Sequence, residues 1–311
     1  MIKLDLVIVT YNRLEKLKKA LDCYEKQTRS FRNLILVDNC STDGTREYAD
    51  DWSKKQSLFH KIVIHTKENL GGAGGFYTGQ KEAMRLEADW VYVADDDAYA
   101  ASDMIEQFYH FIDTHDVSGI SAVCGTVLNV DGTISYEHRG SCKIQKSSFV
   151  RINSVKSDYD KAFFEINLLS YVGSFINVLA LKQVGVANPN YFIFFDDTEH
   201  SLRLKKYGSI LCVPSVKIEH DTISANLANS NIITIDWKVY YWHRNKQRML
   251  LQHYPFVAIV NAVKFLKHYT KFSGKCDKRM VVMKDAYWDA ICGRMGMHNV
   301  YKPGWSEIVS L

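Results

Sequence analysis

The sequence of 311 residues has little of what a linker, a fibrous repeat or a disulfide scaffold would need. It contains only 4 proline and 17 glycine residues, which leave little room for a flexible or low-complexity segment. Its 7 cysteines are odd in number, and no Cys-x-x-Cys motif occurs. This pattern argues against a zinc ribbon and favours free structural thiols in a reducing compartment.

Long hydrophobic runs are also missing. The apolar N-terminal segment 1–9 contains Asp5 and is not followed by the small-residue cleavage site of a signal peptide. The longest apolar run near the other end, 254–266, is interrupted by Asn261 and Lys264. It is shorter than the roughly 20 residues that a helix needs to span a bilayer. We therefore expect a cytoplasmic protein.

A strong charge of one sign is absent as well. The 39 basic and 35 acidic residues give a net charge of +4, which is too small to indicate a nucleic-acid-binding protein. The hydrophobic fraction of 47% is that of a globular protein with a substantial core. The length allows one large domain or two smaller ones.

Strand-like and helix-like segments alternate over the first 115 residues. Short apolar runs predict strands at 4–9, 34–37, 62–64 and 90–93, and helical periodicity predicts helices at 14–24, 45–57, 73–86 and 103–115. Such alternation is typical of βαβ units and of a mostly parallel sheet in an α/β fold. Beyond residue 118 we expect strands at 123–130 and 143–152, a short helix at 199–207, and a helical pattern from 237 onward.

Polar residues follow each predicted strand, where ligands bind in such sheets. The triplet Asp95-Asp96-Asp97 comes directly after a buried strand, and alternation places Asp95 and Asp97 on one side and Asp96 on the other. Adjacent carboxylates repel one another unless a cation is near, and their oxygens suit Mg²⁺ or Mn²⁺. A solvated acidic loop is the alternative interpretation.

Further motifs are weak when taken singly. The glycine-rich segment 68–75 opens a predicted helix but fits neither the phosphate-loop nor the dinucleotide pattern, so it is a ligand-binding loop or a tight turn. Asp196 and Asp197 follow an aromatic run and suit general-base work or helix capping. His220 is a candidate metal ligand or a structural histidine, and Arg244 a candidate diphosphate ligand or an ordinary helix arginine.

The order of these motifs is more specific than any one of them. The segments 7–13, 37–45, 69–75, 95–97 and 195–203 resemble, in this order, the motifs of the inverting family 2 glycosyltransferases with the GT-A fold. The resemblance covers residues 3–225. It is most similar to the bacterial galactofuranosyltransferases and the rhamnosyltransferase-like branch, which the paired glycines, the aspartate triplet and the Tyr-Tyr-x-x-Arg-Asn motif suggest.

The resemblance implies roles for individual residues. Asp197 would be the general base, with Asp196 beside it, and Asp97 and His220 would hold Mn²⁺ or Mg²⁺. The nucleotide sugar would be bound by Thr10, Asn12, Arg13, Asp38, Asn69, Gly72, Gly74, Asp95 and Asp96. His243 and Arg244 would contact the acceptor or the diphosphate.

The implied reaction is inverting transfer of a hexose onto a glycan or lipid-linked acceptor during synthesis of a bacterial surface polysaccharide such as O-antigen. UDP-galactofuranose is the first candidate donor, and dTDP-rhamnose is the alternative donor. The non-enzymatic alternative is that the protein is an inactive sugar-nucleotide-binding scaffold. Phe195 stands where the polymerising relatives commonly carry tryptophan, and the chain is shorter than theirs. We therefore expect addition of one or a few sugars.

The C-terminal segment is basic and aromatic. From residue 237 onward, 13 lysines and arginines face 4 acids, and aromatic residues lie between them. Basic helices with aromatic residues bind anionic membranes peripherally, while the alternative is a packed helical subdomain with solvated lysines. We expect a catalytic domain at 1–225 and a helical region at 226–311, working at the inner face of the cytoplasmic membrane.

Overall fold

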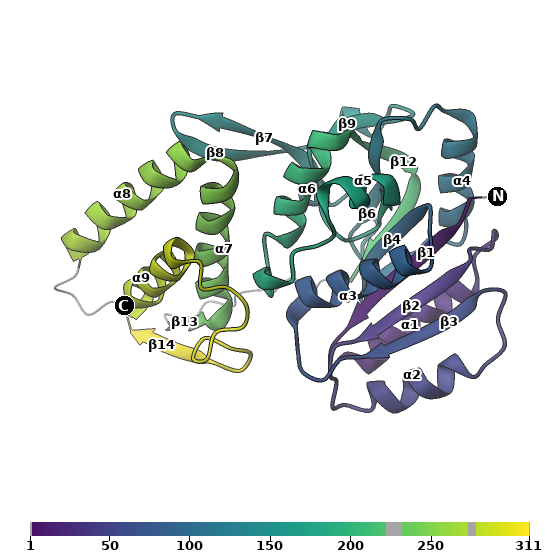
Figure 1. Ribbon diagram of the computed structural model, residues 1–311, viewed down its shortest axis with the longest axis horizontal. Coiled ribbons are helices and arrows are strands. Elements are labelled where there is room, and N and C mark those ends of the chain that lie inside the picture. The colour runs from purple at the N-terminus through teal and green to yellow at the C-terminus, as the bar shows by residue number, and fades with distance from the viewer. Residues whose placement is uncertain (1, 222–231, 273–277, 311) are drawn as a thin grey trace.

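The computed structural model describes residues 2–221, 232–272 and 278–310, which form an α/β body followed by a smaller helical part (Figure 1). Its strands are β1 (Leu4–Thr10), β2 (Asn33–Asp38), β3 (His60–His65), β4 (Trp90–Asp95), β5 (Ala98–Ala100), β6 (Ile120–Leu128), β7 (Arg139–Gln145), β8 (Ser148–Asn153), β9 (Phe164–Ile166), β10 (Leu168–Leu169), β11 (Ser174–Asn177), β12 (Ser209–His220), β13 (Ile232–Asp236) and β14 (Ser306–Ser310). Its helices are α1 (Leu14–Glu25), α2 (Thr45–Ser53), α3 (Gly71–Arg85), α4 (Met104–Thr114), α5 (Val178–Val184), α6 (Asp196–Tyr207), α7 (Trp237–His253), α8 (Pro255–Phe272) and α9 (Lys278–Cys292).

The central sheet runs in the order β3-β2-β1-β4-β11-β6-β12-β5, with β9 added alongside β12. The first four strands are parallel, whereas β11 runs antiparallel between β4 and β6. Thr10 pairs with Asp38, and Val9 with Asp95, so β1, β2 and β4 end at the same edge. The predicted α/β fold with a mostly parallel sheet is confirmed.

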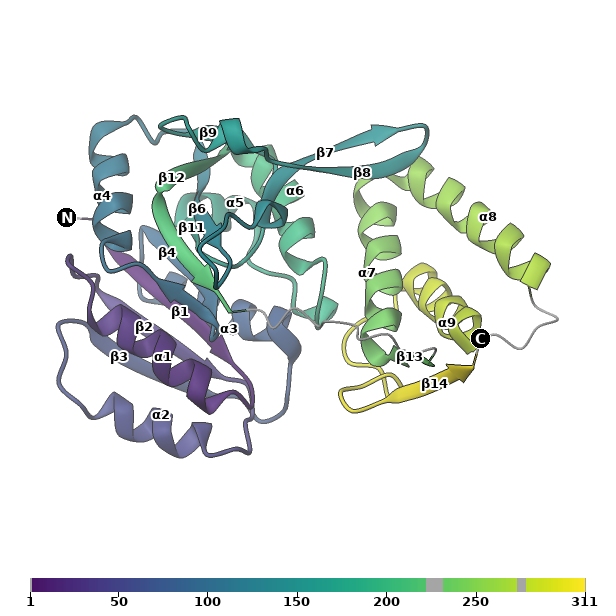
Figure 2. The same cartoon turned by 180° about the vertical axis from the view of Figure 1, so that it is seen from behind.

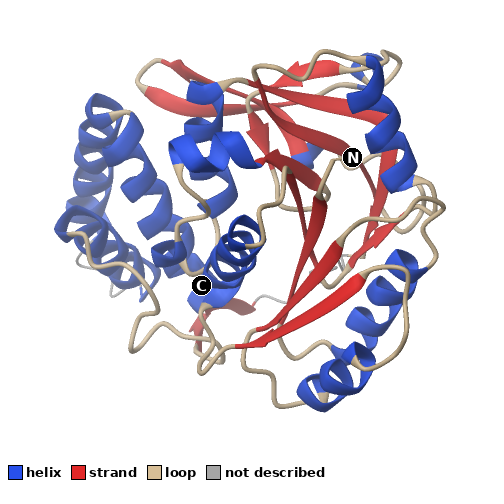
Figure 3. Ribbon diagram, turned by 45° about the vertical axis from the view of Figure 1, so that its right-hand side comes forward, coloured by secondary structure: helices blue, strands red, loops and turns tan. Residues whose placement is uncertain are grey.

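Helices cover both faces of the sheet (Figure 3), and β1 is therefore buried on both sides. Leu4, Leu6 and Ile8 pack with residues of α1, α2 and α4. Val7 and Val9 face the other way and pack with residues of α3, α5 and α6. Each such side chain contributes about 1.5–3 kcal/mol through burial, so the two cores hold the strand ends in a fixed arrangement.

The glycine-rich segment is not a loop but the first turns of α3. A Cβ atom on Gly75 would lie 2.4 Å from Cγ1 of Val9, and one on Gly79 would lie 2.2 Å from Cγ1 of Val7. These distances are too short for any side chain. The segment therefore leads into the helix that the sequence predicts, and two of the glycines in α3 serve to bring the helix close to β1.

The C-terminal part differs from the all-helical prediction, because β13 and β14 pair into a two-stranded antiparallel sheet beside α7 and α9. The single strand expected at 143–152 is instead the β7–β8 hairpin, which turns at Lys146 and Ser147, both with positive φ. Figure 2 shows this hairpin reaching from the α/β body to α7 and α8. The expected boundary at 225/226 lies outside the described residues.

Candidate active site

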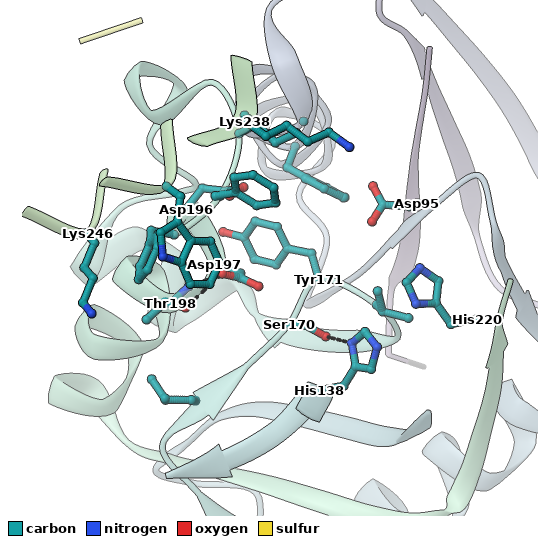
Figure 4. Close-up of a pocket in the computed structure, with 18 of the residues that line it drawn as sticks. Asp95, His138, Ser170, Tyr171, Asp196, Asp197, Thr198, His220, Lys238 and Lys246 are labelled. Atoms are coloured by element: carbon teal, nitrogen blue, oxygen red, sulfur yellow. Dashed lines mark hydrogen bonds between the residues drawn. The ribbon is translucent and has the colours of Figure 1, made fainter. Parts of the chain in front are cut away.

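A cavity of about 570 Å³ opens beyond the carboxyl ends of the strands, between the α/β body and α7. Figure 4 shows Asp95 and His220 on one side of it and Asp196 and Asp197 on the other, with Tyr171 between them. We call the first side the donor end and the second the acceptor end. The structure thus brings into one cavity acids that are 100 residues apart in the sequence.

A smaller cavity of about 260 Å³ continues from the donor end. The two cavities share the lining residues Arg13, Gly72, Asp95, Ile193 and Lys238. Thr10, Asn69 and Asp96 line only the smaller one, as does Asn39. The predicted nucleotide-binding residues Thr10, Arg13, Asn69, Gly72, Asp95 and Asp96 therefore surround connected space that is large enough for an extended ligand.

Asp97 is the most heavily paired acid of the triplet. Its Oδ2 accepts a hydrogen bond from Nη1 of Arg13 at 2.7 Å and lies 3.7 Å from Nζ of Lys16, while its Oδ1 lies 3.2 Å from Nε2 of His220. Burial alone would raise the pKa of Asp97, but the contact with His220 and the charges of Arg13 and Lys16 lower it. Asp97 is therefore a fixed carboxylate, as the sequence predicts for a cation ligand.

The other two acids of the triplet are held less firmly in the charged form. Burial raises the pKa of Asp96 to about 6, although Arg13 and the Thr10 hydroxyl, which donates to Asp96 at 2.7 Å, act in the opposite direction. Burial and the charges of Asp97 and Asp96 raise the pKa of Asp95 well above its usual range. The donor end thus gathers negative charge that needs a cation or a proton.

His220 and Asp97 fit a hard divalent cation. The Nδ1 atom of His220 is buried and has no hydrogen-bond partner in the described part of the chain, so the ring is not fully used by the protein. A carboxylate and an imidazole are suitable first ligands for Mn²⁺ or Mg²⁺, and phosphate oxygens would complete the set. Among the described residues, no group of three or more His, Cys, Asp or Glu side chains is arranged to hold a metal ion.

The acceptor end is built around Asp196 and Asp197, the first two residues of α6. Burial and the charge of Asp197 raise the pKa of Asp196 to about 8. Burial also raises the pKa of Asp197, whereas the positive charge of Arg151 on β8 lowers it. A carboxylate in this setting is a stronger base than one in water, which suits proton abstraction near neutral pH.

A strained loop places this acidic pair. Three loop residues have left-handed backbone angles of 64–65°, namely Phe192, Phe194 and Phe195. Such angles cost a bulky residue about 1–3 kcal/mol each, so neighbouring structure must hold them. The Nδ2 atom of Asn245 donates to three carbonyl oxygens of this loop at 2.7–2.9 Å, those of Tyr191, Ile193 and Phe194.

The Tyr-Tyr-x-His-Arg-Asn motif on α7 therefore acts differently from the prediction. Arg244 is buried, and its Nη1 and Nη2 donate to the carbonyl oxygens of Gly296 and Tyr191 at 2.6 and 3.2 Å. His243 packs against Tyr287, and burial lowers its pKa to about 4. Neither lines either of the two cavities described above. We correct both to structural residues.

Asp38 also takes a different place from the expected one. Its side chain is fully buried, with Oδ2 2.8 Å from Nδ1 of His65 and Oδ1 accepting from the backbone N–H of Ser41. The predicted contact with a nucleobase is not available to a carboxylate used in this way. Its neighbour Asn39 lines the smaller cavity instead and links to Asn69.

Asn12 and Gly74 lie outside both cavities as well. Oδ1 of Asn12 accepts from the backbone N–H of Thr42 at 2.7 Å and so joins the loops after β1 and β2. Gly74 faces the side chain of Leu70, and a Cβ atom added to Gly74 would lie 2.4 Å from Cβ of Leu70. Both residues shape the site without facing a ligand.

Some lining residues were not predicted as site residues. Lys238, Trp242 and Lys246 line the larger cavity and recur every four residues on α7, a spacing that places them on one helix face. That periodicity was visible in the sequence, although nothing in it said which face meets the cavity. Arg151 comes from the β7–β8 hairpin, and Tyr171 from the loop before β11. Neither carried a sequence signal.

Comparison with known proteins identifies the fold and the family. The model of the family "Glycosyl transferase family 2" matches residues 5–175, more than half of the chain. The chain is 29% identical over 206 residues to a protein of Mycolicibacterium smegmatis named galactofuranosyltransferase GlfT1, and 27% identical to a Mycobacterium tuberculosis protein of the same name. These matches cover 65% of this chain and about 65% of each relative.

Solved structures agree with this assignment of the fold. GalNAc-T7, solved with UDP, GalNAc and Mn²⁺, superposes with a TM-score of 0.60 at 16% identity, over 80% of this chain and 48% of that one. TarS of S. aureus, solved with UDP, gives 0.55 at 17% identity, over 94% and 82%. Together with the acids at the strand ends, the matched domain shows that the chain belongs to glycosyl transferase family 2.

Proposed function

We propose that this protein is an inverting glycosyltransferase that moves a hexose from a nucleotide sugar onto a glycan or lipid-linked acceptor of a bacterial surface polysaccharide. The observation that carries the proposal is the position of Asp197, a partly buried carboxylate with a raised pKa, in the same cavity as Asp95, Asp97 and His220. The relatives named galactofuranosyltransferase make UDP-galactofuranose the first candidate donor.

In this proposal Asp197 takes the proton of an acceptor hydroxyl as the oxygen attacks the anomeric carbon. The bond from that carbon to the diphosphate oxygen breaks, and its electron pair leaves with the nucleoside diphosphate. Attack from the side opposite to the leaving group inverts the configuration. The reaction needs no covalent intermediate, and hence no nucleophilic Ser or Cys.

On the donor side, Arg13 and Lys238 line both cavities, where the diphosphate would lie, and their charges favour it as it leaves. Asp97 and His220 would hold the divalent cation, which supplies neutralisation of the leaving diphosphate when bound. Asp95 faces the space for the ribose or the transferred sugar. Arg13 donates to Asp97, so it also keeps that carboxylate in place.

A donor panel tests the proposal. We expect release of nucleoside diphosphate from one donor, in the presence of Mn²⁺ or Mg²⁺ and an acceptor, and a product whose NMR coupling constant shows inverted configuration. Turnover of dTDP-rhamnose in place of UDP-galactofuranose would select the rhamnosyl alternative. If none of the donors in the panel releases nucleoside diphosphate, the result would instead favour a sugar-nucleotide-binding scaffold.

We further propose that α8 lies on an anionic membrane surface. Of the aromatic residues on which the sequence argument rested, Tyr240, Tyr241 and Tyr301 are buried, whereas Trp242, Phe256 and Trp288 are exposed. The helix α8 instead exposes an apolar stripe at helical spacing, made of Phe256, Ile259, Val263 and Leu266. Lysines border the stripe, and 255–272 contains no Asp or Glu. Among the described residues, no helix is long and apolar enough to cross a membrane.

Vesicle sedimentation tests the α8 proposal. We expect salt-sensitive binding to vesicles that contain phosphatidylglycerol, and at least about tenfold weaker binding when Ile259 and Leu266 are both changed to Ser. Leu179→Ser on α5 is the matched control, because Leu179 is 58% exposed, as is Leu266. Equal binding of the double variant and the control would contradict the proposal.

A further inference from the structure

The cations at the two ends of the larger cavity are used differently. At the donor end, Arg13 and Lys16 are bound to the acids of the triplet. At the acceptor end, Lys246 and Arg151 line the wall near Asp197. Among the described residues neither forms an ion pair, and the hydrogen bond of the Arg151 guanidinium goes to a backbone carbonyl, that of Glu137. Positive charge from two separate elements is thus left for a ligand.

The face of α7 that carries Lys246 also presents the aromatic ring of Trp242 to the cavity. Trp242 lies four residues from Lys246 on this face, and 49% of its surface is exposed. Its ring packs edge-on against the rings of Phe195 and Phe194, with centroid distances of 5.0 and 5.7 Å. A ring fixed in this way is a suitable platform for the apolar face of a sugar.

The donor diphosphate does not account for these two cations. Lys246 and Arg151 line only the larger cavity, whereas the smaller cavity is reached through Arg13 and Lys238. Figure 4 shows Lys246 on the side of Asp197 and Thr198, with Asp95 and His220 across the cavity. The anion that Lys246 and Arg151 would bind therefore enters with the acceptor.

We propose that the acceptor carries a phosphate or diphosphate group next to the sugar that is extended, and that Lys246 and Arg151 bind this group. The sugar would stack on Trp242 with its hydroxyl at Asp197. A guanidinium presents paired donors that match phosphate oxygens, and an ammonium adds a compact charge, which together suit a multiply charged group. This inference rests on the proposed function, since it assumes that Asp197 faces the acceptor.

The same chemistry has two sources, a lipid diphosphate or a phosphate within the glycan. Three probes separate them: octyl galactoside, octyl diphosphate-linked galactose, and octyl galactoside that carries a glycerol phosphate. Binding is measured by calorimetry on the protein saturated with UDP and Mn²⁺, so that the donor side is filled. We expect at least one anionic probe to bind tenfold or more tightly than octyl galactoside, and the tighter of the two identifies the source.

Variants locate the effect. Lys246→Gln combined with Arg151→Gln should remove the preference for the anionic probe and leave binding of octyl galactoside within about twofold. Lys81→Gln combined with Arg46→Gln removes the same charge from exposed helix positions outside the cavity and should keep the preference. Equal affinity for all probes, or a preference that survives the first pair of changes, would overturn the proposal.

The readout also separates this proposal from the proposed function. Preferential binding without turnover of any donor would support the anion subsite and contradict catalysis. Donor turnover with no preference among the probes would support the proposed catalysis and contradict the anion subsite.

Discussion

The donor end and the acceptor end of the cavity both place acids near cations, yet they are assembled in different ways. Asp95, Asp96 and Asp97 are consecutive at the end of β4, and the last two are paired with Arg13 and Lys16 at the start of α1. Asp196 and Asp197 depend on α6, on a strained aromatic loop and on α7, and the cations Lys246 and Arg151 of their cavity form no ion pair within the described part of the chain. The acids of the donor end are thus placed by one strand end, whereas the acids of the acceptor end are placed by the packing of separate segments.

The largest expected effect separates chemistry from donor binding. Asp197→Asn keeps the size of the side chain but removes the base, so kcat should fall by about 10²–10⁴-fold. The affinity for UDP with Mn²⁺ should stay within about twofold, because Asp197 does not line the smaller cavity. Asp116→Asn on the exposed loop after α4 is the control. Full activity of the Asp197 variant would break the distinction between the two ends.

A change at the donor end should show the opposite pattern. Asp97→Asn weakens the proposed cation site, so we expect UDP to bind about 10–100-fold more weakly in the presence of Mn²⁺. Without metal, in EDTA, wild type and variant should bind UDP with similar low affinity. Calorimetry measures both cases. An unchanged metal-dependent affinity would show that Asp97 and His220 do not hold the cation.

The strained loop offers a third test. Asn245→Ala leaves buried carbonyl oxygens of the loop without their donor, which should cost about 1–3 kcal/mol of unfolding free energy. Because the loop places Asp197, kcat should also fall by about tenfold at a temperature where the variant is folded. Urea unfolding and initial rates measure the two effects.

Asn261→Ala is the matched control for this test, since its amide binds Gln247 and Tyr287 away from the loop. It should lower stability while kcat stays within about twofold. Equal losses of kcat in both variants would mean that Asn245 acts through general stability.

The smallest expected effect concerns pH. In the proposed mechanism transfer requires ionised Asp197, so the rate should fall on acidification through the pKa of this carboxyl, which burial raises. The charge of Arg151 lowers that pKa, and Arg151→Gln therefore moves the acidic limb of the kcat profile to higher pH. A shift of about half a unit is expected. A shift to lower pH would place Arg151 away from the base.

Part of the site was predictable because its signals are local. The acid triplet and the acidic pair stand in the sequence next to strand and helix patterns, and the structure places all five in the cavities. The contact between Asp97 and His220 joins residues 123 positions apart, and only the family resemblance indicated it.

The errors arose where a residue type has more than one use. Arg244 and Asp38 are polar residues at expected positions, but their side chains form hydrogen bonds within the protein. Gly74, which was predicted to border the nucleotide, packs against Leu70 and lies outside both cavities. Sequence periodicity could not distinguish these uses, because they depend on what lies opposite.

The sequence by itself determined the α/β alternation, the parallel strand ends and the acids that follow them, since periods of 2 and 3.6 residues are local properties of the chain. Tertiary structure alone decided which acids are paired with cations, which loop is held by Asn245, and that Lys246 and Arg151 line the same cavity as Asp197. These features join segments far apart in the chain, and their electrostatics follow from burial, which exists only after the layers have packed.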